Sequence, residues 1–189
     1  MANRIKYGIK NVKYAVATIA SNGSATYAAP KDLPGAVSLS LAAQGDMNKF
    51  YADNIAYYVS VPNNGYEGDL ELALVPEDFY KDVLGFAVGG NSLVYENAGV
   101  EPVHFALLFQ FEGDQKARRH VIYNCVAKRP DVAGSTKEET IEPQTETLSI
   151  TCGTVYVSAL DADVVKAYLN EGDTGYTTFL STVTQPTHT

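Results

Sequence analysis

The sequence lacks the features that would place it in a membrane or in an oxidising compartment. Its 189 residues contain no run of about 18 apolar residues, the length needed for a membrane-spanning helix. Residues 1–14 lack the apolar core of a secretory signal peptide, so we expect a protein of the cytoplasm or of an assembly built there. The two cysteines, Cys125 and Cys152, form no CxxC pair, and we expect free buried thiols rather than a disulfide or a metal site.

Positive charge is also scarce. The formal net charge is −8 and the pI is about 4.8. This argues against a protein that grips nucleic acid, because such binding depends on Lys and Arg displacing counterions from phosphate. A negative wall would instead let a polyanion pass without sticking. The acidity has a simpler alternative explanation, which is solubility.

Histidine, the commonest acid–base catalyst, occurs only three times, at His104, His120 and His188. In the hairpin expected over residues 105–127, His120 lies opposite Gln110 and far from His104. These two imidazoles would then share neither a proton nor a metal ion. We expect them to be surface or strand-edge residues.

Other catalytic arrangements lack partners as well. Cys125 is expected among apolar core side chains, where a thiol is unreactive. Asp69 and Glu71 lie two residues apart on one strand, which suits solvated charges better than a catalytic carboxylate pair. The Gly-containing turns lack the GK[ST] ending of a phosphate-binding loop. We therefore expect no catalytic residue, no cofactor and no metal ion.

What the chain does contain is strict alternation of apolar and polar residues. Residues 36–41 and 67–75 both alternate, with apolar side chains at Val37, Leu39, Leu41, Leu70, Leu72 and Leu74. A period of two is typical of a strand with one dry and one wet face. Similar patterns predict strands at 11–20, over residues 105–127 and at 145–152.

One short helix is predicted from Pro76 to Gly85. Proline suits the first helical position, and the acidic residues after it complement the positive end of the helix dipole. Phe79 and Val83 form its buried stripe, packed on the outside of the strands, and Gly85 is a left-handed stop.

The clearest hairpin is predicted over residues 105–127, with its turn at 113–117. Facing residue numbers would sum to about 230 in this register. One face would then carry Phe105, Leu107, Phe109, Phe111, Val121, Tyr123 and Cys125, and the other, only half apolar, Ala106, Leu108, Gln110, His120, Ile122 and Asn124. Glu112 would face Arg118 as a cross-strand ion pair.

Several long blocks of this sequence together resemble the major tail (tail tube) protein of long-tailed, siphovirus-type bacteriophages and prophages of Gram-positive bacteria. The blocks are LPGAVSLSL, FYADNIAYYV, NNGYEGDLELALVPEDFYKDVLG, FALLFQFEGDQKARRHVIYNC and KEETIEPQTETLSIT, in this order. The resemblance covers about Lys6 to Cys152, whereas residues 153–189 match only loosely.

The resemblance implies a mainly β fold, a β-sandwich or barrel-like phage tail-tube fold with one short flanking α-helix and long inter-subunit loops. Residues 1–152 would form the tail-tube domain and 153–189 a C-terminal extension that contacts other subunits. Such proteins form hexameric rings that stack into the tail tube of the virion, through which DNA reaches the host. The other partners it implies are the tape measure, tail terminator and distal tail proteins.

Two segments are then expected to contact other subunits, the long excursion at 42–67 and the loop at 131–143, because segments of this length are usually functional. The residues expected to make these contacts are Phe50, Tyr51, Tyr57, Tyr58, Lys137, Glu138 and Glu139. Core and helix packing is expected of Phe79, Val83, Phe109 and Cys125.

Two other functions are left open. One is a tube subunit of a related contractile-tail or secretion-type apparatus, which shares the architecture. The other is a carbohydrate-binding β-sandwich, since 13 of the 20 aromatic residues are tyrosine. Carbohydrate platforms favour tryptophan, and this chain has none.

Overall fold

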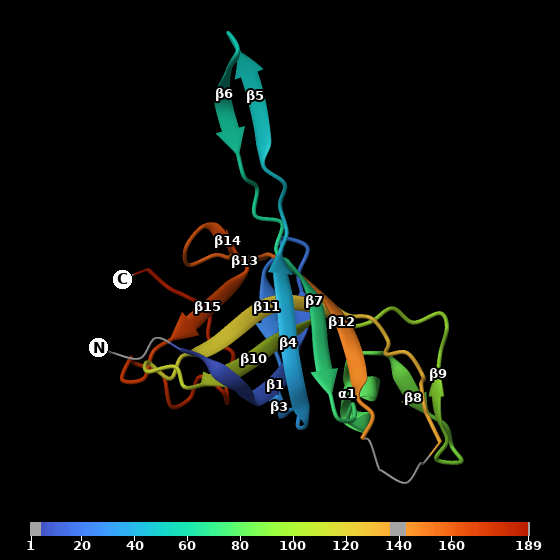
Figure 1. The fold of residues 1–189 in the computed structure, drawn as a ribbon. Helices are drawn as coiled ribbons and strands as arrows, with labels where there is room; N and C mark the ends of the chain where they lie inside the picture. Colours follow the sequence, from blue (N-terminus) through green and yellow to red (C-terminus); the bar gives the residue numbers. More distant parts are fainter. Residues whose placement is uncertain (1–4, 137–142, 189) are drawn as a thin grey trace.

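Antiparallel strands make up most of the fold, which a computed structural model describes for residues 5–136 and 143–188. A nine-stranded sheet has the order β2-β1-β10-β11-β12-β7-β4, with β15 added to β11 and β3 to β1 (Figure 1). Its strands are β1 (Tyr7–Ile19), β2 (Ala25–Tyr27), β3 (Lys31–Asp32), β4 (Ala36–Ala43), β7 (Tyr66–Leu72), β10 (Phe105–Glu112), β11 (Arg119–Ala127), β12 (Glu146–Gly153) and β15 (Lys166–Leu169).

Smaller elements extend from this sheet. The described residues form three two-stranded hairpins, β5 (Asn48–Ala52) with β6 (Ile55–Ser60), β8 (Phe86–Val88) with β9 (Val94–Glu96), and β13 (Val155–Val157) with β14 (Ala162–Val164). The helix α1 (Glu77–Asp82) is the single α-helix of the described chain. The fold is thus mainly β with one short helix, as expected.

Strand β10 lies at the centre of the core because it is buried on both faces. Phe105, Leu107 and Phe109 belong to the main core cluster, which also takes in side chains of β1, β7, α1 and β12. Ala106 and Leu108 belong to a second cluster on the opposite face. The sequence pattern predicted that this opposite face is only half apolar. In the structure, a further segment of the chain covers the face and buries it.

The covering segment is the C-terminal part of the chain. Val155, Phe179 and Leu180 are buried in the second cluster, and β15 pairs directly with β11. The Tyr123 hydroxyl donates a hydrogen bond of 2.8 Å to the Thr184 carbonyl. Residues 153–188 therefore pack on the same sheet as the residues before them, and β12 runs through position 152 without a break.

The predicted register of the β10–β11 hairpin is wrong beyond its first pair. Phe105 pairs with Cys125 as expected, but an irregularity then shifts the register by one residue. The following pairs are Leu107–Ile122, Leu108–Val121, Phe109–His120 and Gln110–Arg119. A one-residue shift exchanges the two faces of a strand. Ile122 therefore joins the main cluster, whereas Val121 and Tyr123 lie in the second cluster.

The predicted ion pair between Glu112 and Arg118 is absent for the same reason. Glu112 instead accepts from Lys10 of the adjacent β1, with a distance of 3.0 Å. The Arg118 guanidinium lies 3.6 Å from the Asp114 carboxylate in the turn.

Two of the apolar positions predicted to point inward are exposed. Val37 is 52% exposed, because a register irregularity between Ala36 and Ser38 interrupts the alternation of β4. Leu74 is 68% exposed, because β7 ends at Leu72 and the chain turns there towards α1. Leu70 and Leu72 are fully buried, in agreement with the pattern.

Helix α1 packs its Phe79 and Val83 side chains into the main core cluster, whereas Glu77 and Asp78 on its other side are exposed. Phe79 and Val83 are fully buried, and the Phe79 ring meets the rings of Tyr14 and Phe105 edge-on at 5.0 and 5.5 Å. Pro76 occupies the N-cap rather than the first helical position. Gly85 has a φ of +77°, the left-handed conformation expected of it.

The two cysteines lie directly opposite each other on β11 and β12. Both thiols are free and fully buried, with their Sγ atoms 2.9 Å apart. Burial raises the pKa of the Cys125 thiol, and the contact with Cys152 raises it further. A neutral thiol without solvent access is a poor nucleophile.

Replacing Phe79→Ala should lower the free energy of unfolding by about 3–5 kcal/mol, since it leaves a cavity where three aromatic rings meet. Urea denaturation followed by circular dichroism measures this change. Leu74→Ala is the matched control and should change stability by less than about 0.5 kcal/mol. Equal losses in the two variants would contradict the placement of α1 in the core.

Candidate interaction surfaces

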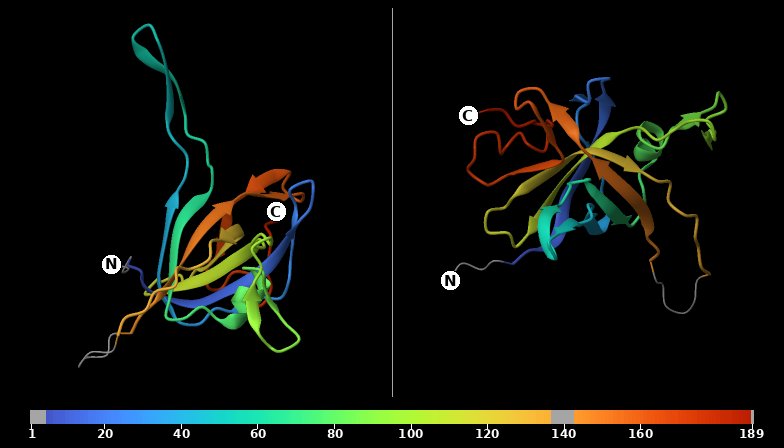
Figure 2. Two further views of the ribbon diagram at one scale, coloured as in Figure 1. Left: turned by 90° about the vertical axis from the view of Figure 1, so that its right-hand side faces the viewer. Right: turned by 90° about the horizontal axis from the view of Figure 1, so that it is seen from above.

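The β5–β6 hairpin projects far from the sheet. It continues from the end of β4 and returns into β7, and Figure 1 and the left view of Figure 2 show it rising away from the strands and from α1. Asp53 and Asn54 form its two-residue turn, each with a positive φ, as in the type I′ turn that suits a hairpin.

The hairpin exposes apolar and aromatic side chains on both of its faces. The residues concerned are Met47, Phe50, Tyr51, Ile55, Tyr57, Tyr58, Val59 and Val61, each between 48% and 72% exposed. Phe50 and Tyr58 face each other across the two strands. Two strands without a further layer are marginally stable in water. An exposed patch of this kind usually marks an interaction site.

The base of the hairpin is firmly anchored. Gln44 and Gly65 are joined by a backbone hydrogen bond of 2.9 Å, and Asn64 donates another, of 3.0 Å, to Gln44. Gly65 has a φ of +90°, and a Cβ atom there would come within 1.9 Å of the Cys152 carbonyl oxygen. The close packing of β7 on β12 therefore requires glycine where the hairpin joins the sheet.

A second surface is the outer face of β4, β7 and β12, which is acidic. None of these three strands contains lysine or arginine. The middle strand, β7, carries Glu67, Asp69 and Glu71 on this face, about 7 Å apart by strand geometry. Their neighbours on the two flanking strands are small, Ser38, Ser40 and Ala42 on β4 and Thr147, Ser149 and Thr151 on β12.

Hydroxyl groups hold these carboxylates in place. Ser38 and Thr145 donate hydrogen bonds of 2.9 and 2.7 Å to Glu71, and Ser149 donates one of 2.8 Å to Asp69. The bonds from Thr145 and Ser38 lower the pKa of the Glu71 carboxyl. The face therefore stays negative at neutral pH and presents short side chains to solvent.

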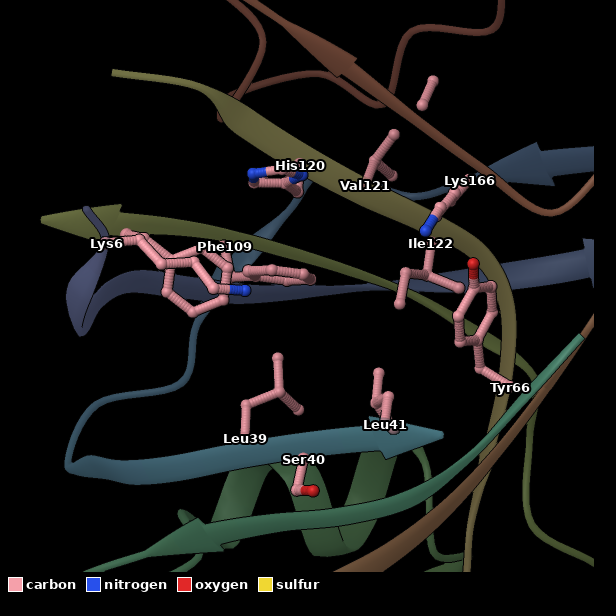
Figure 3. A pocket seen from close by; sticks show the side chains of 12 residues that line it. Lys6, Leu39, Ser40, Leu41, Tyr66, Phe109, His120, Val121, Ile122 and Lys166 are labelled. Carbon is pink, nitrogen blue, oxygen red and sulfur yellow. The ribbon is translucent and has the colours of Figure 1, made fainter. Parts of the chain in front are cut away.

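The third feature is a pocket of about 390 Å³ between β4 and the β10–β11–β15 side of the sheet. Strand β4 pairs only with β7 among the described strands, which leaves its other edge open next to this pocket. Figure 3 shows Leu39 and Leu41 pointing from β4 towards Phe109 and Ile122 across the space.

The ionisable side chains that line this pocket include basic groups but no carboxylate. Its lining contains Lys6, Lys166 and His120 but no aspartate or glutamate. The Lys6 ammonium lies 4.8 Å from the centre of the Phe111 ring, and that of Lys166 lies 4.4 Å from the Tyr66 ring. Neither lysine forms an ion pair with any described residue.

His120 presents an aromatic surface in this pocket. Its ring stacks on Phe109 with 5.2 Å between centroids and 12° between planes. Burial lowers the pKa of the His120 imidazole, and Arg118, Lys166 and Lys6 act in the same direction, whereas Asp114 opposes them. The prediction that His120 faces Gln110 is wrong, because the shifted register puts it opposite Phe109.

Another histidine, His104, lies apart from His120. The His104 Nδ1 atom lies 2.6 Å from the side chain of Asn124, which is on β11, four residues after His120. No cluster of three or more His, Cys, Asp or Glu side chains suitable for a metal ion occurs in the described part of the chain.

The structure places some of the expected contact residues and adds others. Phe50, Tyr51, Tyr57 and Tyr58 lie on the projecting hairpin, with their side chains in solvent. Lys137, Glu138 and Glu139 lie outside the described residues. Phe109 and Cys125 are buried, and Phe109 also lines the pocket. Sequence reasoning missed Lys6 and Lys166, because nothing in their local patterns connects them with a shared pocket.

The described helix is far too short to cross a membrane, and no longer apolar helix is present in residues 5–136 and 143–188. The chain matches no protein-family model and no curated protein.

Replacing residues 46–61 by a short Gly-Ser turn should leave a folded protein. The segment contributes no side chain to either core cluster, so the free energy of unfolding should change by less than about 0.5 kcal/mol. Urea denaturation of this variant, called here the hairpin-less variant, measures the change. A large loss of stability would mean that the hairpin is part of the folding core and not a free arm.

Proposed function

We propose that this protein is a structural subunit of a tube, built from stacked hexameric rings, through which DNA is delivered to a bacterial host. Support comes from the resemblance to major tail proteins and from the three surfaces described above. In this proposal the tube is the tail of a long-tailed phage and the subunits assemble in the host cytoplasm before joining the virion.

The observation that carries the proposal is the hairpin. It is long, anchored at its base, and apolar on both faces, yet its large apolar side chains are 48–72% exposed. A lone enzyme or a small-ligand receptor has little use for such an arm. A polymer subunit does, because neighbouring copies cover the arm and gain its apolar area.

The open edge of β4 supports the same conclusion. Unpaired backbone groups on an edge strand are a hazard for a monomer, since they can pair with another chain. In a ring the same edge is a joint, where each copy can complete the sheet of the next. The ordered alternation of Leu39, Ser40 and Leu41 keeps this edge in regular strand geometry.

The acidic face of β4, β7 and β12 suits the wall of a DNA channel. Its carboxylates have the same sign as the phosphates of DNA, and its side chains are short. DNA would displace no counterions by passing it, so no strong binding would slow the transit. The tape measure, tail terminator and distal tail proteins are further partners that the resemblance implies.

Electron microscopy of concentrated purified protein tests the proposal directly. The wild-type protein should form annuli or tubes with a central channel. The hairpin-less variant should stay monomeric although it is folded. A wild-type protein that remains a compact monomer at every concentration, or a hairpin-less variant that forms normal tubes, would contradict the proposal.

DNA binding gives a second, independent test. Wild-type tubes should retain double-stranded DNA weakly, and the retention should depend little on salt. Asp69→Lys should introduce salt-sensitive retention by placing a cation on the proposed wall in every subunit. The same change of charge at Glu171→Lys, which follows β15 and lies outside the three-strand face, should not. The affinity is measured by co-sedimentation over a series of salt concentrations. Tight, salt-sensitive binding by the wild-type protein would refute the assignment of the acidic face.

A further inference from the structure

The hairpin and the pocket have complementary chemistry. Building on the proposed function, we propose that the tip of the β5–β6 hairpin of one copy docks into the pocket of a second copy, with the Asp53 carboxylate placed near Lys166. The pocket would thus be the receptor for the hairpin, and the contact would join successive copies.

The pocket offers both an apolar wall and unbalanced positive charge. Leu39, Leu41 and Phe111 are only partly buried there and line an unfilled volume of about 390 Å³, within the usual range of ligand sites. The two lysines lie at opposite ends of the space (Figure 3). In a chain with net charge −8, a lining of this kind without a carboxylate favours an anionic, apolar occupant.

The hairpin tip has this character. Asp53 is one of the two turn residues and so lies at the far end of the arm. Phe50, Tyr51 and Ile55 lie beside the turn, each more than 60% exposed. The tip therefore presents a carboxylate surrounded by apolar side chains, the counterpart of an apolar pocket flanked by ammonium groups.

The occupant must come from another copy. Strand β4 supplies one wall of the pocket and leads directly into the hairpin, which then points away from the sheet (Figure 2). Asn48–Ala52 alone extends about 16 Å in strand geometry. The tip cannot fold back onto its own pocket while the base keeps the backbone hydrogen bonds between Gln44, Asn64 and Gly65.

A contact between two different surfaces of the same protein has a structural consequence. When two copies are docked, one still has an unused hairpin and the other an unused pocket, so the interaction is head-to-tail and does not close on two copies. Repetition of a head-to-tail contact generates either a closed ring or an open stack of copies. A tube of stacked rings contains contacts of both kinds.

Cysteine cross-linking of the full chain tests the contact. The double variant Asp53→Cys, Lys166→Cys is assembled under reducing conditions and then oxidised with diamide, which takes up the two hydrogen atoms released as the disulfide forms. It should give a ladder of disulfide-linked multimers on a non-reducing gel. The matched control, Asp53→Cys with Lys128→Cys, places the second thiol outside the pocket and should give none. The native thiols are buried and should not interfere.

A charge exchange tests the same contact without cross-linking. Lys166→Glu alone and Asp53→Lys alone should each raise the protein concentration needed for assembly about tenfold or more, because like charges would then meet. The double variant should recover most of this loss. Unchanged assembly in both single variants would overturn the proposed contact.

The outcomes separate this inference from the proposed function. Wild-type tubes that form normally, with no ladder from the Asp53–Lys166 cysteine pair, would refute the docking and leave the tube function standing. A wild-type protein that forms no polymer would refute both. A ladder confined to the polymerised double variant, together with rescue by the charge exchange, would support the docking.

Discussion

Burial of β10 on both faces is the constraint on which the rest of the structure depends. Its main-cluster face takes up α1 and the inner sides of β7 and β12, and its other face takes up the C-terminal segment. These contacts bury large apolar side chains of the N-terminal strand β1, of helix α1 and of the C-terminal segment. Among the described residues, the hairpin has no apolar layer to pack on, and β4, whose Leu39 and Leu41 pack against the main cluster, has one unpaired edge. Their exposure thus follows from how the core is filled.

The three surfaces complement one another when several copies are considered. Among the described residues, nothing covers the apolar side chains of the hairpin, nothing fills the pocket, and one edge of β4 has no partner strand. Each feature alone would be a liability in a monomer. Contacts between copies would cover the hairpin, fill the pocket and pair the edge of β4 at the same time. The acidic face then remains exposed, and a channel for DNA is a use that suits its charge.

Local pattern was sufficient to predict α1, the strands with strict alternation and an excursion at residues 42–67. It failed where position depends on tertiary packing. The one-residue shift in β11 moved Ile122 and His120 to the opposite face, and no local signal marks such an irregularity. The pocket was not foreseeable either, because it joins Lys6, β4 and Lys166, which are far apart in the sequence. The direction of the hairpin likewise follows from packing at Gly65 and not from its own residues.

The central claim is that copies of this chain cover the surfaces that one copy leaves open. Hydrogen–deuterium exchange, followed by mass spectrometry on dilute and assembled protein, measures this cover directly. The account predicts that amides of β5, β6 and the open edge of β4 exchange rapidly in the dilute protein and become strongly protected on assembly, while those of β10 are protected in both states. Rapid exchange of the hairpin in an assembled sample, or full protection of it in an isolated monomer, would contradict the account.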